Sequence, residues 1–321
     1  MLTVRFRLAA AAAGMLCLPA AASCGSAFCL VNTDWSVQGT WVDTGVRGDL
    51  RYEYIDLDQP RTGTHDVGVG DIPRDHDEVE TRNRNLVASF DFGLAHHWGL
   101  NLAIPYVDRY HLHIHHDVEG DAGEPETWNF RGLGDASLRA RYQAYEKLDD
   151  PEAIQSAGLV FGVKLPTGRI DVANAQGEQA ERTLQPGTGT TDLVLGGFWH
   201  SDYRTGHSVF ASATAQLPTN ERDGYKPGKR LQVDAGYRYA WGPQTGLLLQ
   251  VNYLAKGRDS GENAEPEDSG QRMLYASPGI TYNVGPRAQL YAFVQVPLYQ
   301  SVNGVQLVAD WSAAAGVSWK F

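Results

Sequence analysis

A run of histidines between positions 111 and 117 has the composition of a transition-metal site. The segment reads His111-Leu112-His113-Ile114-His115-His116-Asp117, so that three histidines alternate with apolar residues. On an extended strand, His111, His113 and His115 project from one face, about 6.6 Å apart. Imidazole nitrogens at that spacing suit Zn, Cu or Ni, and the acidic segments near 71–80 and 119–126 could complete a site. The alternative is a histidine-rich strand outside the membrane with no resident cofactor and only adventitious metal binding.

The sequence does not support a catalytic site. His207 and Ser208 are adjacent, so on a strand their side chains point to opposite faces and cannot act together as base and nucleophile. The segments Gly132–Asp135 and Pro186–Thr190 are rich in glycine. Strands are expected to follow them, whereas a phosphate-binding loop needs a lysine and a following helix. We therefore expect a protein that is not an enzyme.

The N-terminus predicts export from the cytoplasm. Arg5 and Arg7 precede an apolar run from Leu8 to Leu18, and small residues end at Ala22, which is the order of elements in a secretory signal peptide. The run is shorter than the roughly 20 residues that a membrane-spanning helix needs. We divide the chain into a signal peptide (1–22), a periplasmic lead-in (23–45) and a membrane domain (46–321).

Two of the three cysteines, Cys24 and Cys29, remain after signal cleavage. Because an exported pair so close in the chain is expected to oxidise, we predict a disulfide between them. A redox or metal-binding pair is the alternative, although the two residues lack the CxxC spacing. The lead-in itself could add a short strand around Trp35–Gln38 or partly plug the membrane domain.

Alternation of apolar and polar residues dominates the chain from about residue 46 onward. In Leu231–Tyr239, for example, Val233 and Tyr237 share one face, while Asp234 and Arg238 share the other. This period of two is typical of a strand with one apolar and one polar wall. We count about twelve such strands, each near the ~9–11 residues of a tilted membrane span. They fall at Leu50–Tyr54, Leu86–Phe92, Leu100–Tyr106, Ala136–Tyr142, Leu159–Leu165, Asp192–His200, Val209–Ala215, Leu231–Tyr239, Leu247–Tyr253, Leu274–Tyr282, Leu290–Val296 and Trp311–Phe321.

The connections and the C-terminus favour a membrane barrel over a soluble β-sandwich. Short connections near 95–98, 203–207, 242–246 and 285–287 alternate with long polar ones near 57–80, 115–131, 168–188, 218–228 and 257–270. Short periplasmic turns and long outer loops are the arrangement of outer-membrane barrels. The chain ends in Phe321 with Trp319 on the same face, which resembles the terminal strand recognised by the outer-membrane assembly machinery. We therefore predict an all-β fold, a transmembrane antiparallel up-and-down β-barrel in the bacterial outer membrane.

The inward stripes of this barrel are polar and mixed in sign. Charges at this density cannot face lipid, where an Arg or Lys at the midplane costs about 2–4 kcal/mol. A barrel of about twelve strands is wider than one filled by its side chains and narrower than a large porin, so we expect a narrow, partly obstructed channel. The alternative is an interior closed by salt bridges. The charged residues expected to line the lumen are Glu53, Asp91, Arg109, Arg139, Arg141, Lys164, Asp192, Asp234, Arg238 and Asp310.

The charge of the chain excludes one class of partner. The formal net charge is −11, and removing the two arginines of residues 1–22, which contain no acid, gives −11 − 2 = −13 for the mature chain. Nucleic acid requires a basic face, so it is not an expected partner. The expected partners are outer-membrane lipid, a small-molecule solute and, through Phe321, the assembly machinery.

Three motifs carry a resemblance to a known family. They are Gly132-Leu133-Gly134-Asp135, Gly162-Val163-Lys164-Leu165-Pro166-Thr167-Gly168 and Gln185-Pro186-Gly187-Thr188-Gly189-Thr190-Thr191-Asp192, in this order. In these motifs the chain resembles, from about residue 46 to its end, the outer-membrane barrels labelled as transporters of the phenol-degradation (meta) pathway. The resemblance implies a channel for small organic compounds, including aromatic ones. The two other functions that we consider are a metal-binding accessory barrel using His111, His113 and His115, and a structural or adhesive barrel.

Overall fold

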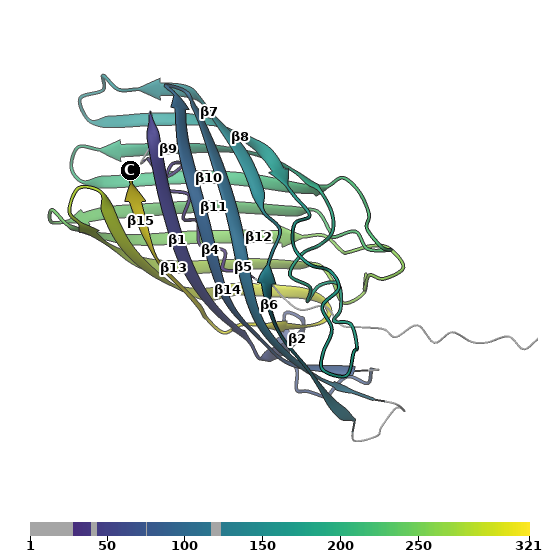
Figure 1. Ribbon diagram of the computed structural model, residues 1–321. Helices are drawn as coiled ribbons and strands as arrows, with labels where there is room; N and C mark the ends of the chain where they lie inside the picture. Colours follow the sequence, from purple (N-terminus) through teal and green to yellow (C-terminus); the bar gives the residue numbers. More distant parts are fainter. Residues whose placement is uncertain (1–27, 40–43, 75, 117–122) are drawn as a thin grey trace, which may run out of the picture.

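The computed structural model describes residues 28–39, 44–74, 76–116 and 123–321. None of these residues forms a helix long and apolar enough to cross a membrane. Twelve strands make up the main sheet (Figure 1). They are β1 (Gly45–Leu57), β4 (His76–Ala95), β5 (Trp98–His115), β7 (Ser137–Lys147), β8 (Ala153–Lys164), β9 (Asp192–Tyr203), β10 (His207–Pro218), β11 (Arg230–Trp241), β12 (Thr245–Lys256), β13 (Gln271–Val284), β14 (Ala288–Val308) and β15 (Ser312–Lys320).

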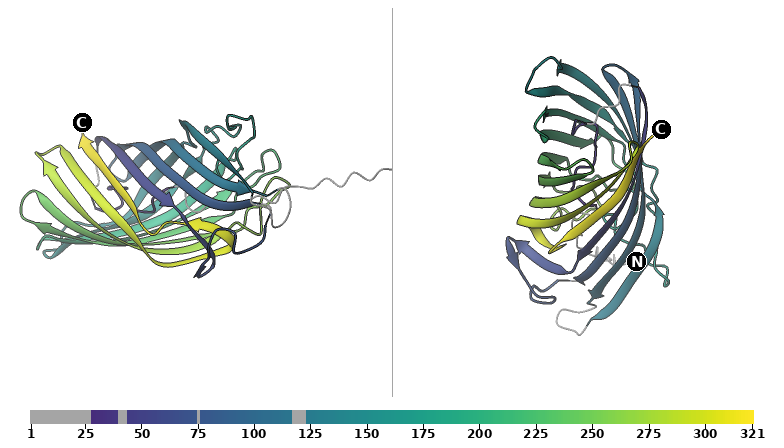
Figure 2. Two further views of the ribbon diagram at one scale, coloured as in Figure 1. Left: turned by 90° about the horizontal axis from the view of Figure 1, so that it is seen from below. Right: turned by 90° about the vertical axis from the view of Figure 1, so that its left-hand side faces the viewer.

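The twelve strands form a closed antiparallel barrel. Each strand pairs with the next one in chain order, and β15 pairs with β1 to close the ring. Hairpin turns gather at one end and the long connections at the other (Figure 1), and Figure 2 shows the strands curving around a common interior. The predicted barrel of about twelve strands is therefore confirmed, and each of the twelve predicted stripes falls on one of these strands.

Alternation of side chains explains why this sequence closes into a barrel. On β1, Leu50 and Tyr52 are exposed on the outer wall, whereas Asp49 and Glu53 are buried inside. Leu50 lies opposite Val317 on β15 and Ala88 on β4, so apolar residues adjoin across strands. An apolar outer face and a polar inner face satisfy lipid and lumen at once.

Two connections that the sequence predicted as loops contain strands. β2 (Gln59–Gly63) and β3 (His65–Asp66) lie in the first and pair with β14 and with each other. β6 (Glu124–Leu133) lies in the second and pairs with the outer half of β5. These strands extend the wall formed by β4, β5 and β14 beyond the remaining strands. Their sequences lack the long apolar stripe of the other strands, although Trp128 and Phe130 on β6 share one face and are buried in the core.

The longer turn between β7 and β8 is held together by one aspartate. Asp150 accepts hydrogen bonds from the backbone N–H of Glu152 (2.9 Å) and Ala153 (3.3 Å). The Lys147 ammonium donates to the same carboxylate at 2.6 Å. This local network fixes the backbone where the connection enters β8.

Candidate functional site in the barrel lumen

Residues 28–39, which we call the plug, lie inside the barrel. The Asn32 side-chain amide donates to Ser212 and Asp234, both at 3.1 Å. The Trp35 indole N–H donates to Asp49 at 3.2 Å, and its ring packs edge-on against Tyr291. These partners come from four strands, so the plug spans the lumen rather than lying below it. The described part of the predicted lead-in is thus a plug, and Trp35–Gln38 form a turn instead of the short strand considered from the sequence.

The outer half of the lumen is apolar where the plug covers it. Leu30 packs on Leu254 and Met273, and the three side chains are almost fully buried. A cavity of about 10 Å³ remains between the plug and the wall, which is room for roughly one water molecule. It is lined by Phe28, Leu30, Ile55, Leu57, Met273, Tyr275, Gln295, Leu307, Val308, Ala309 and Ser312. In the described residues, the plug therefore closes an apolar section of the lumen.

Sequence analysis missed this apolar section, although a signal for it is present. On β1 the inward positions run Asp49, Arg51, Glu53, Ile55 and Leu57, so the same face changes from charged to apolar toward the outer end. Alternation alone separates the two faces and does not show where along a strand the inward face becomes apolar. The parity of Ile55 and Leu57 could have revealed the change.

The charged residues predicted to line the lumen occupy three kinds of position. The buried ones are Glu53, Asp91, Arg109, Arg141, Lys164, Asp192 and Asp234. Arg139 and Arg238 are half-buried. Asp310 is exposed in the turn between β14 and β15, because the strand alternation stops at Val308 before this residue.

Several of these charges hold other segments rather than lining open space. Glu53 pairs with Arg51 at 2.7 Å and accepts a hydrogen bond from the Cys29 backbone N–H at 3.4 Å. Arg109 donates to the backbone carbonyl of Leu184, in the connection between β8 and β9. Mixed charge on the inner wall therefore anchors the plug and an inward-folded loop.

Cys29 is the one cysteine within the described residues, and it is buried. Its sulfur lies 3.5 Å from Gln295 Oε1 and 3.7 Å from Ser312 Oγ, both on the inner wall. Burial raises the pKa of the thiol to about 11. Cys24 and the signal peptide (1–22) lie outside the described residues, so the disulfide and the cleavage site stay predictions.

The three motifs that carry the family resemblance meet in one buried network. The Lys164 ammonium lies 2.7 Å from Asp135 and 3.4 Å from Asp192. Asp135 also accepts hydrogen bonds from the backbone N–H of Gly168 (3.0 Å) and of Thr188 (2.9 Å). This network, called the motif network below, ties the ends of β7, β8 and β9 to both ends of the connection over 165–191.

Glycines allow the backbones of this connection to cross. A Cβ on Gly187 would lie 2.6 Å from the backbone of Gly168, closer than real Cβ contacts come. We therefore expect Gly187→Ala to destabilise the barrel by about 1–3 kcal/mol through overpacking, measured by urea unfolding in detergent. Gly132→Ala is the matched control, because its Cβ would have no neighbour nearer than 3.9 Å. Equal stability of the two variants would contradict the crossing.

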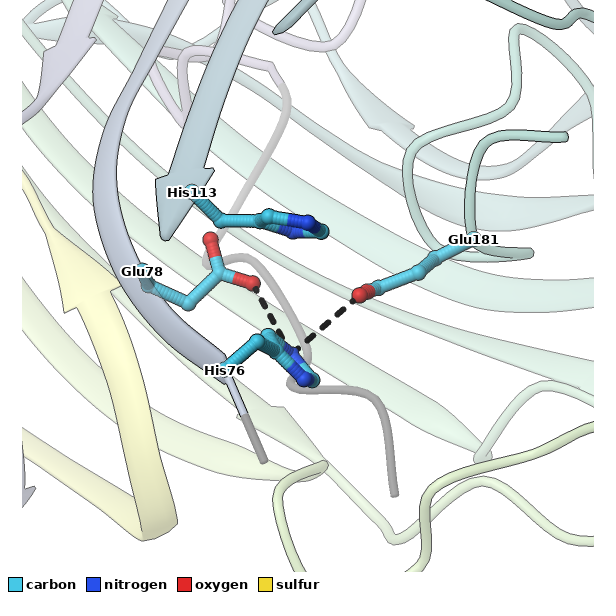
Figure 3. Close-up of side chains that lie close together, drawn as sticks. All are labelled: His76, Glu78, His113 and Glu181. Carbon is cyan, nitrogen blue, oxygen red and sulfur yellow. Dashed lines mark ion pairs between the residues drawn. The ribbon is translucent and has the colours of Figure 1, made fainter. Parts of the chain in front are cut away.

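The histidine run lies at the outer end of the lumen, where the structure groups it differently from the predicted arrangement. His113 comes together with His76, Glu78 and Glu181 (Figure 3), a set that we call the His–Glu cluster. His111 is fully buried beside it, with Nε2 3.6 Å from Glu78. His115 lies further along β5 and is not a member. Glu78 belongs to the acidic segment that the sequence suggested, whereas His76 and Glu181 were missed.

The electrostatics of this end are dominated by buried acids in loops. Burial raises the pKa of Glu181 well above its usual range, and the charges of Glu265 and Glu78 raise it further. Burial likewise raises the pKa of Glu265, with added repulsion from Glu78 and Asp268. A raised pKa favours the protonated acid in the folded protein. Ionisation at higher pH therefore destabilises this end of the barrel unless a cation offsets it.

The sequence also matches a known family. Residues 76–307 match the family described as "Putative MetA-pathway of phenol degradation". The chain belongs to this family. The match to the phenol-degradation family runs from the first residue of β4 almost to the end of β14 and includes the whole motif network. The resemblance inferred from the motifs is confirmed. A search of curated protein sequences found no relative of the chain.

A solved structure shares the fold of this member of the phenol-degradation family. An outer membrane channel from Pseudomonas putida F1 superposes with a TM-score of 0.63 at 14% identity, covering 87% of this chain and 97% of that one. The NanC porin gives 0.45 at 10% identity, covering 85% and 100%. The Pseudomonas putida toluene transporter TodX gives 0.41 at 8%, covering 93% and 96%. The likeness to the Pseudomonas putida F1 channel shows the fold of this chain. The protein is a bacterial outer-membrane β-barrel.

Proposed function

We propose that this barrel is a channel for small, largely apolar solutes, with monoaromatic compounds such as phenol as the expected class. The observation that carries the proposal is the apolar section of the lumen beneath Leu30 of the plug. Ile55, Leu57 and Met273 give this part of the inner wall an apolar surface, which suits an apolar solute better than an ion or a sugar. The printed description of the family, which refers to phenol degradation, supports the same class.

The plug defines how such a channel works. Beside the apolar packing of Leu30 and Trp35, it binds the wall through hydrogen bonds, for example from Leu30 N–H to Gln295 at 3.2 Å and between Asn32 and Gln250 at 2.9–3.0 Å. Each such bond contributes only about 0.5–1.5 kcal/mol net, so water or a solute can replace them one at a time. We infer that an apolar solute competes with Leu30 for the apolar section and that the plug shifts as the solute passes.

Single-channel recording in planar bilayers tests the proposal. We expect discrete openings whose current falls as phenol is added and is unchanged by glucose at the same concentration. Met273→Asn should weaken the phenol effect severalfold, because it places an amide in the apolar section. Thr214→Ala on β10, a strand that does not line the cavity, should leave the effect unchanged. The absence of channel openings in every condition would contradict the proposal. So would a phenol block that is the same in the natural chain and in Met273→Asn.

A further inference from the structure

We propose that His76, Glu78, His113 and Glu181 bind one divalent transition-metal ion at the outer end of the lumen. None of these four residues lines the apolar section proposed to hold the solute. Each of the four residues offers one ligand atom, and these atoms all lie within 4.8 Å of one another. His76 Nε2 lies 3.4 Å from Glu181 Oε1 and 3.9 Å from Glu78 Oε1 (Figure 3). Zinc holds N and O ligands at about 2.0–2.2 Å, so tetrahedral ligand atoms sit roughly 3.3–3.6 Å apart.

The four ligands come from three separate segments. His76 and Glu78 begin β4, and His113 lies near the end of β5, directly across the sheet from Glu78. Glu181 comes from the connection between β8 and β9, which the motif network and Arg109 fold into the lumen. An ion in the His–Glu cluster would therefore fasten that inward-folded connection to the outer ends of β4 and β5.

The orientation of His113 supports a metal-binding role. Its Nε2 lies 2.8 Å from Glu126 Oε2, and its ring packs against Trp128 at 4.8 Å between centroids. Its Nδ1 has no hydrogen-bond partner among the described residues and is buried. A histidine that ligates a metal usually donates its other ring N–H to a carboxylate, which fixes the ring. Glu126 and Trp128 hold His113 in that arrangement.

The charge at the cluster supports a cation independently. The strongest charges acting on Glu181 are the carboxylates of Glu265, Glu78 and Asp268. The positive charge of Arg74 opposes them. Arg74 is engaged by Asp268 at 2.7 Å. Neither carboxylate oxygen of Glu181 accepts a hydrogen bond from the described residues. Buried carboxylates are costly unless they are paired or coordinate a metal.

The donor set selects the class of metal. Two imidazoles with two carboxylates suit zinc and its neighbours among the transition metals, whereas calcium and magnesium prefer oxygen ligands alone. A second group joins His96 and His97, in the turn between β4 and β5, to Glu146 on β7. Its His96 side chain is 58% exposed, so water competes there for the ion. It provides an internal control for surface binding of zinc.

Zinc binding to the full-length mature barrel in detergent micelles, followed by isothermal titration calorimetry, tests the site. We expect one zinc ion per chain at the His–Glu cluster, with Trp128 fluorescence changing as the site fills. The double variant His76→Ala with His113→Ala should abolish this binding. Glu126→Gln should lower the affinity by about 10–100-fold, because it removes the orienting carboxylate. His96→Ala with His97→Ala should leave the binding unchanged.

Three results would overturn the site. The first is zinc binding that survives the double variant, and the second is binding lost with His96→Ala and His97→Ala. The third is calcium binding as tight as that of zinc, which would indicate an acidic calcium site. Heat-dependent gel mobility confirms that each variant is a folded barrel. His113→Gln, which keeps the size of the side chain, replaces the double variant if the latter fails to fold, and it must also lower the affinity at least tenfold.

Discussion

Replacing residues 28–39 with a glycine–serine segment of equal length raises the single-channel conductance of the barrel severalfold. The plug fills the lumen with Leu30 and Trp35, whose side chains are each only 1% exposed. A ring of twelve strands has an interior wider than its own side chains fill, so removing the plug leaves an aqueous path. Planar-bilayer recording of the refolded variant beside the natural chain measures the change.

Because the replacement has the same length, it removes the side chains that fill the lumen without shortening the segment that precedes β1. Residues 23–27 and all residues from 40 onward keep their natural sequence in this variant. Asn32→Ala alone is the milder companion, since it removes the bonds to Ser212 and Asp234 but leaves Leu30 and Trp35 in place. We expect it to raise the frequency of openings and not the size of the largest current. Equal conductance of the natural and plug-replaced chains would show that residues 28–39 do not obstruct the path.

Lys164→Met destabilises the barrel by about 3–5 kcal/mol, the range found when one partner of a buried ion pair is removed. Lys164 is 10% exposed and faces both Asp135 and Asp192, whose side chains are 7% and 1% exposed. The substitution leaves two buried carboxylates without their cation. Urea unfolding in detergent micelles, followed by tryptophan fluorescence, measures the loss.

A surface pair from the same connection is the control for the motif network. Arg169 and Asp171 form an ion pair at 2.9 Å with both side chains more than half exposed. Arg169→Ala should cost less than about 1 kcal/mol, as exposed pairs generally do. If Lys164→Met and Arg169→Ala cost the same, the motif network does not hold the connection in place.

The barrel was predictable because its walls obey one local rule. Residues such as Leu231 and Asp234 on β11 show which face meets lipid and which meets the lumen, and the same alternation marks the twelve strands of the barrel. β6 was not predictable in this way, because its residues pair with β5 beyond the lipid, where neither face has to be continuously apolar. Turn chemistry at Asp150 likewise acts over a few residues and leaves no periodic pattern.

The contents of the lumen depend on contacts that the sequence does not encode locally. Asn32 bonds Asp234, about two hundred positions away, and nothing in the order of residues 28–39 indicates that partner. Glu181 joins His113 only because the motif network folds a polar loop inward. The sequence did identify His113 and the acidic segment that contains Glu78. It could not identify His76 and Glu181, since convergence of separate segments is a property of the closed barrel.

A reversible cross-link between the plug and the wall tests whether the plug must move for a solute to pass through the barrel. Cys29 Sγ lies 3.7 Å from Ser312 Oγ, so Ser312→Cys in a Cys24→Ser chain places two thiols within reach of a disulfide. The measurement is uptake of labelled phenol by cells that lack other porins and express this variant. We predict that oxidation abolishes the uptake that the barrel supports and that dithiothreitol restores it. Uptake that is equal in the oxidised and reduced states, or reduced-state uptake no greater than that of cells without the barrel, would contradict a plugged channel for small apolar solutes.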